Sequence, residues 1–180
     1  MKVRWLGAPG DDEPRSQEAA RAAERRALKE LAAIYRAVDV LLAPFTCDRS
    51  GACCQLRRTG REPFLFPIEL RRLLEGLERA GRPLPAERGD GGCRLLDESG
   101  VRCSVYGDRP FGCRTFFCEK GRGPRSMPNT EISHLSARLT RLSDGLAFGV
   151  SPRQLTALLA EAADGPNRSP PNAATLAPAG

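Results

Sequence analysis

Hydrophobic residues recur at three- and four-residue steps near the start of the chain, which is the spacing of an amphipathic helix. The stretch follows Ser16, a favourable N-cap, and runs until Pro44, which cannot continue a helix. Its expected buried face comprises Ala20, Ala27, Leu31, Ile34, Val38 and Leu41, with Leu28, Tyr35 and Leu42 beside them. The pattern therefore predicts one long helix that covers the core of its own domain.

Three further helices are predicted downstream. One opens at Pro67, where the missing N–H of proline is harmless, and ends near Gly81. Another is expected over 131–148, where leucines and an isoleucine keep the helical spacing. The last begins with the capping box of residues 151–154, in which Pro152 takes the first helical position, and ends at about Ala163.

Between the helix that starts at Pro67 and the helix over 131–148, the pattern changes to short apolar runs on either side of a turn. Residues 95–106 are predicted to form a β-hairpin. The two ends, 1–15 and 164–180, contain few large apolar residues, and we expect a flexible lead and a disordered tail. The expected fold class is mainly α with a small β-hairpin. A single domain over 16–163 would pack its helices around a cysteine-rich metal-binding core.

Composition places the chain among soluble globular proteins. It has 180 residues, of which 41% are hydrophobic and 28% are charged. No stretch approaches the roughly 18 continuous apolar residues of a membrane helix. Residues 1–15 also lack the apolar run of a secretory signal. We therefore expect a cytoplasmic protein that does not associate with a membrane.

The charge pattern favours solvated helix faces over a nucleic-acid surface. The formal net charge is +6, but acidic residues are interleaved with the basic ones over 18–30 and 69–79. Aromatic side chains for base stacking are few near the basic residues. We expect no nucleic-acid partner and leave a protein partner open. The exceptions are basic residues that accompany the cysteines: Arg57, Arg58, Arg61, Arg109, Arg114, Lys120, Arg122 and Arg125.

Seven cysteines are the most informative feature of the sequence. In a reducing cytosol, closely spaced thiols in an odd number indicate metal ligands or redox groups more than a disulfide framework. Thiolates suit zinc and iron–sulfur clusters, and four thiolates give either site a charge near −2. We expect Arg109 and Arg114 to offset that charge beside the cofactor. The candidate metal ligands are Cys47, Cys53, Cys54, Cys93, Cys103, Cys113 and Cys118.

Seven thiols exceed one four-ligand site and are one short of two such sites. His134, Asp48 or Asp108 could supply an eighth ligand. Phe111, Phe116 and Phe117 are expected to cover the metal.

Three groups of residues resemble a known family. They are the run from Phe45 to Cys54 (FTCDRSGACC), then Gly92-Cys93-Arg-Leu-Leu, then the run from Cys103 to Arg114 (CSVYGDRPFGCR). This order is similar to that of the YkgJ-type cysteine-cluster proteins, a zinc- or iron-chelating domain, and the resemblance covers about 45–118. It implies a bound metal, often taken to be an iron–sulfur cluster. Relatives include the flagellin lysine-N-methylase, so the resemblance implies no single reaction.

The chain departs from the family pattern at one ligand. The family has a second cysteine where this chain has Ser50, and Cys118 is additional to the pattern. Serine is a poor ligand for these metals. Our hypothesis is that Cys118 replaces the missing ligand. The alternative is that water or a substrate occupies an open coordination position.

Three functions fit these observations. The first is a cytoplasmic metal-binding protein that holds an iron–sulfur cluster, of the 4Fe–4S type, or Zn2+ through cysteine thiolates, and delivers it, senses with it or transfers electrons. The second is a protein-modifying enzyme with an open metal position. The third is a zinc-stapled module that binds RNA or protein. The sequence contains no P-loop, nucleophile elbow or HExxH motif, so we predict no particular enzymatic activity.

Overall fold

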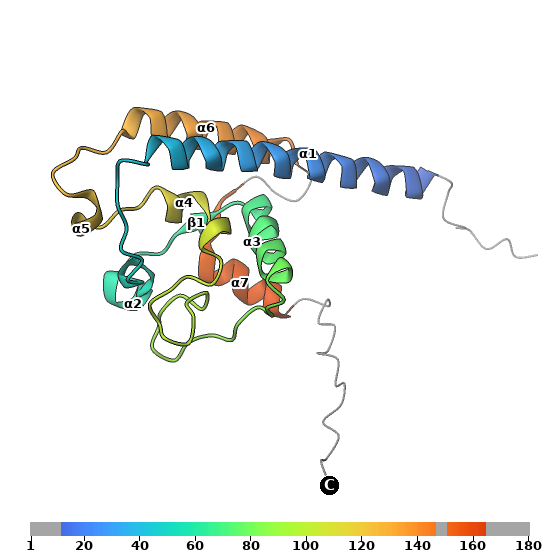
Figure 1. Cartoon of the computed structure of the whole chain (residues 1–180). Coiled ribbons are helices and arrows are strands. Elements are labelled where there is room, and N and C mark those ends of the chain that lie inside the picture. Colours follow the sequence, from blue (N-terminus) through green and yellow to red (C-terminus); the bar gives the residue numbers. More distant parts are fainter. Residues whose placement is uncertain (1–11, 147–150, 165–180) are drawn as a thin grey trace, which may run out of the picture.

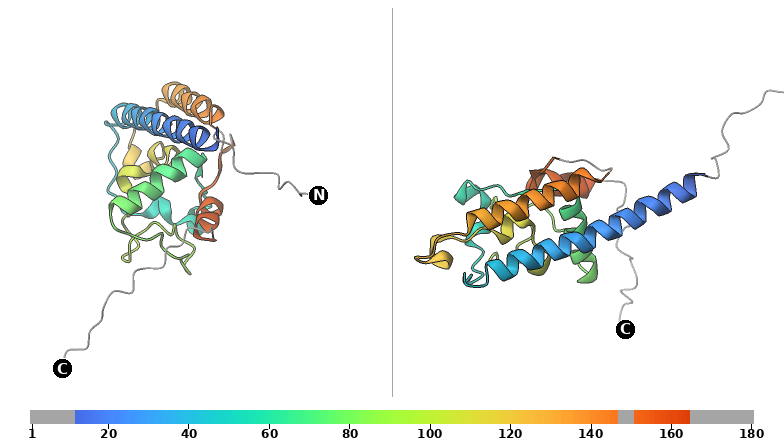
Figure 2. Two further views of the ribbon diagram at one scale, coloured as in Figure 1. Left: turned by 90° about the vertical axis from the view of Figure 1, so that its right-hand side faces the viewer. Right: turned by 90° about the horizontal axis from the view of Figure 1, so that it is seen from above.

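Two long helices, α1 (Asp12–Leu41) and α6 (Asn129–Asp144), lie side by side and antiparallel in the computed structural model (Figures 1 and 2). The structure describes residues 12–146 and 151–164. Helix α3 (Pro67–Arg79) packs against α1, and α7 (Leu155–Asp164) packs against α3. The start of α1 extends beyond the rest of the helical layer (Figure 2). No helix among the described residues is long and apolar enough to span a membrane.

The remaining elements are short and lie between Leu41 and α6. The elements are η1 (Ala52–Cys54), α2 (Leu56–Thr59), β1 (Phe64–Leu65), η2 (Tyr106–Asp108), α4 (Phe111–Arg114) and α5 (Glu119–Arg122). Irregular loops connect them, the longest running from α3 to η2 along the edge of the molecule opposite α1 (Figure 1). The chain is therefore mainly helical, as the hydrophobic pattern predicts.

The long first helix starts earlier than predicted. It begins at Asp12, so Ser16 lies within the helix and does not cap it. Acidic residues at 12 and 13 favour the N-terminal end of a helix, and Pro14 is tolerated because the first N–H groups have no partner in the helix. The predicted buried face is confirmed except that Ala20 is exposed and Leu41 is half-buried. The predicted lead before Asp12 lies outside the described residues.

Helix α3 begins at Pro67, as predicted. Its start is closed by Glu69, whose Oε2 accepts a hydrogen bond from the backbone N–H of Phe66 at 2.9 Å. The other oxygen, Oε1, accepts the hydroxyl of Tyr35 on α1 at 2.9 Å and the N–H of Phe111 on α4 at 2.7 Å. One buried carboxylate thus joins three segments of the chain.

The antiparallel strand pair forms between distant segments. Strand β1 pairs with β2 (Arg153–Gln154), with Phe64 opposite Gln154. Residues 153–154 were predicted as the first turn of the last helix, but this pairing holds them extended, and α7 begins at Leu155. The carboxylate of Glu62 accepts the N–H of Thr156 at 2.9 Å and so takes the place of the expected local cap. The tail beyond Asp164 lies outside the described residues.

The predicted hairpin over 95–106 is reduced to a single bridge between Leu96 and Cys103. The N–H of Asp97 donates to the carbonyl of Arg102 at 2.8 Å, and that of Ser104 donates to Leu95 at 2.8 Å. Apart from the bridge residues, the segment contains turns at 98–99 and 104–105 and bends at 100–102, and no extended strand. The predicted third helix ends at Asp144, and 147–150 lie outside the described residues.

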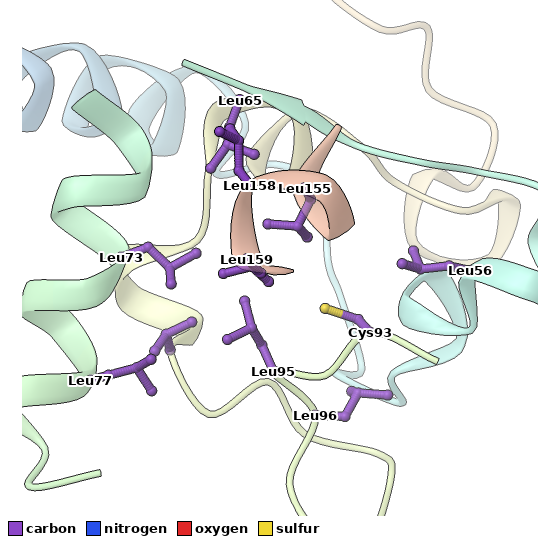
Figure 3. Packing of buried hydrophobic residues seen from close by; sticks show 11 residues of the cluster. Leu56, Leu65, Leu73, Leu77, Cys93, Leu95, Leu96, Leu155, Leu158 and Leu159 are labelled. Atoms are coloured by element: carbon purple, nitrogen blue, oxygen red, sulfur yellow. The ribbon is translucent and has the colours of Figure 1, made fainter. Parts of the chain in front are cut away.

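Two clusters of buried side chains hold the fold together. The helix core lies between α1, α3, α4 and α6 and consists of Ala27, Leu31, Ile34, Tyr35, Val38, Leu42, Phe66, Ile68, Phe111 and Leu139. The leucine core lies between α3, α7 and the loops and consists of Leu56, Leu65, Leu73, Leu77, Cys93, Leu95, Leu96, Val105, Leu155, Leu158 and Leu159 (Figure 3). Cys93 is the one cysteine buried within it.

Candidate metal centre

Six cysteines surround one small cavity, which we call the inner cavity. All seven cysteines of the chain are free thiols. The inner cavity measures about 60 Å³. This is far below the roughly 300–1,000 Å³ of clefts that take organic ligands, so the space suits an inorganic group. Its cysteines come from separate segments: Cys47, Cys53, Cys54, Cys93, Cys103 and Cys113.

A second cavity adjoins the first, and we call it the outer cavity. It measures about 50 Å³ and contains the seventh cysteine, Cys118, in its wall. Four cysteines line both spaces: Cys47, Cys53, Cys54 and Cys103. The sequence predicted that these thiols act together, and the structure brings them around two neighbouring cavities.

Close backbone packing positions the first group of cysteines. Gly51 has φ +70°, and a Cβ atom there would lie 2.9 Å from the backbone of Val101. Glycine is therefore required for the loop to approach the 97–101 turn. The N–H of Cys54 donates to Gly51 at 2.9 Å, and the N–H of Cys93 donates to the carbonyl of Cys54 at 2.7 Å. The first cysteine group and Cys93 thus lie together.

Cys103 and Cys113 reach the cavity by different means. Cys103 pairs with Leu96 in the isolated bridge, which places it across from the segment that carries Cys93. Cys113 lies on α4, where its N–H donates to Pro110 at 2.9 Å. Glu69 holds the start of α4 through the N–H of Phe111. Helix α4 therefore connects the cavity to the helical layer.

The adjacent thiols Cys53 and Cys54 are in contact and shift each other's pKa. Their sulfur atoms are 3.9 Å apart. The hydrogen bond from Cys54 lowers the pKa of Cys53 to about 6, and the same contact raises the pKa of Cys54 well above that of a free thiol. The cationic side chains of Arg61 and Arg109 also lower the pKa of Cys53. At neutral pH this pair therefore offers one thiolate, a form that binds metal directly.

Burial keeps the other inner thiols protonated in the metal-free protein. It raises the pKa of Cys93 to about 11 and that of Cys113 to about 12, and it also raises the pKa of Cys103. Removing a thiol from water disfavours its charged form. A metal bound here would have to displace these protons, as it does in other thiolate sites.

Two arginines line the inner cavity. The guanidinium of Arg61 donates to the carbonyl of Gly112 at 2.5 Å and lies 3.8 Å from the centre of the Phe116 ring. The guanidinium of Arg109 lies 3.8 Å from the centre of the Tyr106 ring. Its Nε is buried and has no hydrogen-bond partner among the described residues. A half-buried cation with a buried, unused donor beside a group of thiols fits an anionic occupant such as a metal–thiolate centre.

Arg114, the other predicted cofactor-binding arginine, points elsewhere. Its guanidinium is 4% exposed and donates to the carboxylate of Asp39 on α1 at 2.7 Å. It also donates to the carbonyls of Gly107 and Arg109 and lies 4.1 Å from the centre of the Tyr35 ring. These partners occupy the Arg114 side chain, so Arg114 fastens α4 to α1. The place beside the thiols that was predicted for Arg114 is taken by Arg61.

The three candidates for an eighth ligand are separated by the fold. His134 is exposed on α6. Asp108 forms ion pairs with Arg72 at 3.0 Å and Arg79 at 2.8 Å. Asp48 lines the outer cavity, and its Oδ1 accepts the N–H of Ser50 at 3.1 Å. Only the last is near the cysteines.

The aromatic and apolar walls come from several parts of the chain. Phe116 and Phe117 line both cavities, whereas Phe111 belongs to the helix core. Pro63 and Leu155 complete the inner wall. Sequence reasoning missed these last two because they reach the cavity through the pairing of β1 with β2, which has no local signal.

The thiol ligands fit zinc or iron, although they do not converge on a single coordination position. Within 12–146 and 151–164, no group of three or more His, Cys, Asp or Glu side chains has the arrangement of a finished metal site. The chemistry still matches a soft metal, because free thiols, half-buried cations and a mostly apolar cavity occur together. Metal binding would draw these thiols inwards and release their protons.

Comparison with known proteins supports the same conclusion. No curated protein and no solved structure matches the chain. Residues 46–132 match the model of the CxxCxxCC family, which is described as a "Putative zinc- or iron-chelating domain". This range contains all seven cysteines together with Arg61 and Arg109. Over residues 46–132 the chain is therefore similar to the CxxCxxCC family, which is also the family of the YkgJ-type proteins.

Proposed function

We propose that this protein binds a metal centre with more than one metal atom, an iron–sulfur cluster, through the cysteines of the inner cavity. One observation carries the proposal: six thiols line a single space of about 60 Å³. An iron–sulfur cluster and a tetrahedral zinc ion each take four cysteine thiolates, and the inner cavity provides more than this number.

The residues around the cavity support an anionic cluster in specific ways. Arg61 and Arg109 supply positive charge next to the thiols, and Arg109 Nε is available as a donor. Hydrogen bonds and charge near the sulfurs are the means by which a protein adjusts a cluster's potential. Phe116 and Phe117 limit access of water to the same space. The cluster would supply one-electron chemistry or a metal signal that the side chains alone cannot provide.

The exposure of two thiols bears on the biological role. Cys47 and Cys118 are exposed, whereas the other cysteines are buried or half-buried. One side of the centre would therefore be open to solvent and to partners. Such access favours delivery or sensing of the metal over long-term electron transfer, because an exposed ligand is easily attacked or oxidised. We place this role in the cytoplasm, where thiols remain reduced.

Anaerobic purification followed by metal and sulfide analysis tests the proposal. We expect iron and acid-labile sulfide in similar amounts, with at least about two iron atoms per chain, and a broad absorption band in the visible range. A colourless protein with a single zinc ion per chain would contradict the cluster and leave only a structural zinc site. Reconstitution of metal-free protein with iron and sulfide under argon, beside a parallel zinc titration, provides a second measurement.

A further inference from the structure

The CxxCxxCC motif is incomplete in this chain. Cys47, Cys53 and Cys54 occupy three of its cysteine positions, and Ser50 occupies the remaining one. A serine hydroxyl is a hard and weakly acidic group, so it is a poor substitute for thiolate at zinc or at an iron–sulfur cluster. The motif therefore lacks one ligand on the loop between α1 and η1.

Cys118 faces the same space as the serine. Both residues line the outer cavity, together with the motif cysteines and Cys103. Cys118 is distant in sequence, beyond α4 and immediately before α5. The fold thus places the Cys118 thiol in the same cavity as Ser50, where the motif lacks a cysteine.

Two contacts hold the Cys118 segment against the motif loop. The rings of Phe45 and Phe117 pack with their centres 5.4 Å apart. The N–H of Thr46 donates to the carbonyl of Gly121 at 3.2 Å. These contacts join the residues just before Cys47 to the residues on either side of Cys118, so they keep the two exposed thiols near each other.

Gly121 makes this approach possible. It is buried, and a Cβ atom at this position would lie only 2.5 Å from the carbonyl oxygen of Thr46. No other residue could keep the same contact without moving backbone atoms. The N–H of Arg122 donates to the carbonyl of Cys118 at 2.9 Å, which fixes the start of α5 relative to the thiol.

We propose that Cys118 supplies the metal-binding thiolate that Ser50 cannot supply, so that this chain completes its centre from the start of α5. The inference rests on the proposed metal binding. Coordination would convert the Cys118 thiol to a thiolate and release its proton to solvent, with no change in oxidation state. Because Cys118 is exposed, this ligand would also be the first to exchange when the metal is removed.

Four proteins test the proposal: wild type, Cys118→Ser, Ser50→Ala and the double variant Ser50→Cys/Cys118→Ser. Each is purified anaerobically, and iron, zinc and sulfide are counted per chain. Release of metal to a chelator is then timed from the absorption spectrum. We expect Cys118→Ser to release its metal at least about tenfold faster than wild type, since even loss of a supporting residue around a ligand has an effect of that size.

The other two variants separate the proposal from its alternatives. Ser50→Ala should match wild type, because the hydroxyl is not a ligand. The double variant moves the thiol to the family position and should restore slow release and the wild-type spectrum. Restoration would show that Cys118→Ser had lost a ligand and had not simply misfolded. Failure of the double variant to improve on a weakened Cys118→Ser would contradict the proposal.

Failure of the inference is distinguishable from failure of the proposed function. If wild type contains metal and Cys118→Ser has the same metal content, spectrum and release rate, only the role of Cys118 is overturned. If wild type contains neither iron nor zinc and takes up neither on reconstitution, both are overturned.

Gly121→Ala provides a test that keeps every thiol. The added methyl group should push the Cys118 segment away from Thr46 and accelerate metal release in the same direction as Cys118→Ser. Gly107→Ala is the matched control, because a Cβ atom there meets no other atom within 4 Å. Equal release rates for the two glycine variants would contradict the proposed positioning of Cys118.

Discussion

The helical layer and the cysteine region are built in different ways. The layer of α1, α3 and α6 has long helices and an apolar core in which Leu31, Ile34 and Val38 have no exposed surface. The cysteine region, residues 46–59 and 91–118, has helices of only three or four residues, loops and one isolated bridge. In a long helix most backbone N–H and C=O groups form hydrogen bonds within the helix. Short elements depend on side chains or a bound cofactor to hold their backbone in place. We therefore expect the helical layer to hold its shape alone and the cysteine region to depend more on a bound metal.

Removal of an inner ligand is the strongest test of this difference. We expect Cys113→Ser to lower metal content at least about tenfold, a loss no smaller than that from weakening a supporting residue. Far-ultraviolet circular dichroism should still report the helices. Thr115→Ser at the end of the same helix keeps its hydroxyl contact to Phe111 and serves as control. Full metal content in Cys113→Ser would place the centre elsewhere.

A core substitution should lower stability and leave metal content unchanged. Leu31→Ala removes a fully buried side chain and should lower the free energy of unfolding by about 2–5 kcal/mol. Metal per folded chain should not change. Denaturant unfolding and metal analysis check the two results. Val40→Ala, on the same helix but 76% exposed, should be close to wild type. Loss of metal from folded Leu31→Ala would show that the two regions are not independent.

Glu69 connects the two regions, so its substitution should affect both moderately. The carboxylate accepts hydrogen bonds on both oxygens from Tyr35, Phe66 and Phe111. An amide accepts on one side only, so Glu69→Gln leaves a buried donor unpaired and should cost about 1–3 kcal/mol of stability. Chemical denaturation measures this. Glu75→Gln, which loses only surface ion pairs on the same helix, is the control, and equal stability of the two variants would contradict the connecting role.

Metal affinity should rise with pH. Burial raises the pKa of Cys93 to about 11 and of Cys113 to about 12, so these thiols carry protons at neutral pH and release them when metal binds. Each proton changes the binding free energy by about 1.4 kcal/mol per pH unit. Below about pH 6, Cys53 also takes up a proton, and the dependence should become steeper. Zinc titration in weak buffer measures the protons released. Binding without proton release would contradict the assignment of these thiols.

The smallest effect on stability is expected from substitution of Asp39, the α1 partner in the ion pair with Arg114 of α4. The Asp39 side chain is 51% exposed, although its partner Arg114 is buried. Asp39→Asn should lower the free energy of unfolding by at most about 1 kcal/mol, because solvent screens an exposed ion pair. Thermal or chemical denaturation measures this, with Asp144→Asn on α6 as a surface control. A loss of several kcal/mol would contradict the screening of this ion pair by solvent.

Much of the helical layer could be predicted from sequence, because its signals are local. Proline at 67 marks the start of α3, and the apolar spacing of α1 identifies its buried face. The cysteines could be recognised as one group for the same reason. By contrast, the pairing of β1 with β2 and the cap that Glu62 gives to α7 join residues far apart in the chain. No local pattern encodes such contacts.

In the candidate site, too, some features could be predicted from local sequence and others depend on long-range packing. The motif identified the thiols and its own departure at Ser50, but it could not place Arg61 beside the cavity or turn Arg114 towards α1. Those positions depend on where α4 packs. The shared cavity of Ser50 and Cys118 likewise depends on the contact of Thr46 with Gly121, which is a consequence of the complete fold.

Hydrogen exchange of the whole chain, with and without metal, is the most direct test of whether bound metal organises the cysteine region. We predict that metal slows exchange strongly over 46–59 and 91–118, while protection of α1 and α6 hardly changes. The metal-free sample is prepared by anaerobic chelation and is checked by reconstitution. Equal protection of the cysteine region in both samples would contradict the claim that bound metal organises it.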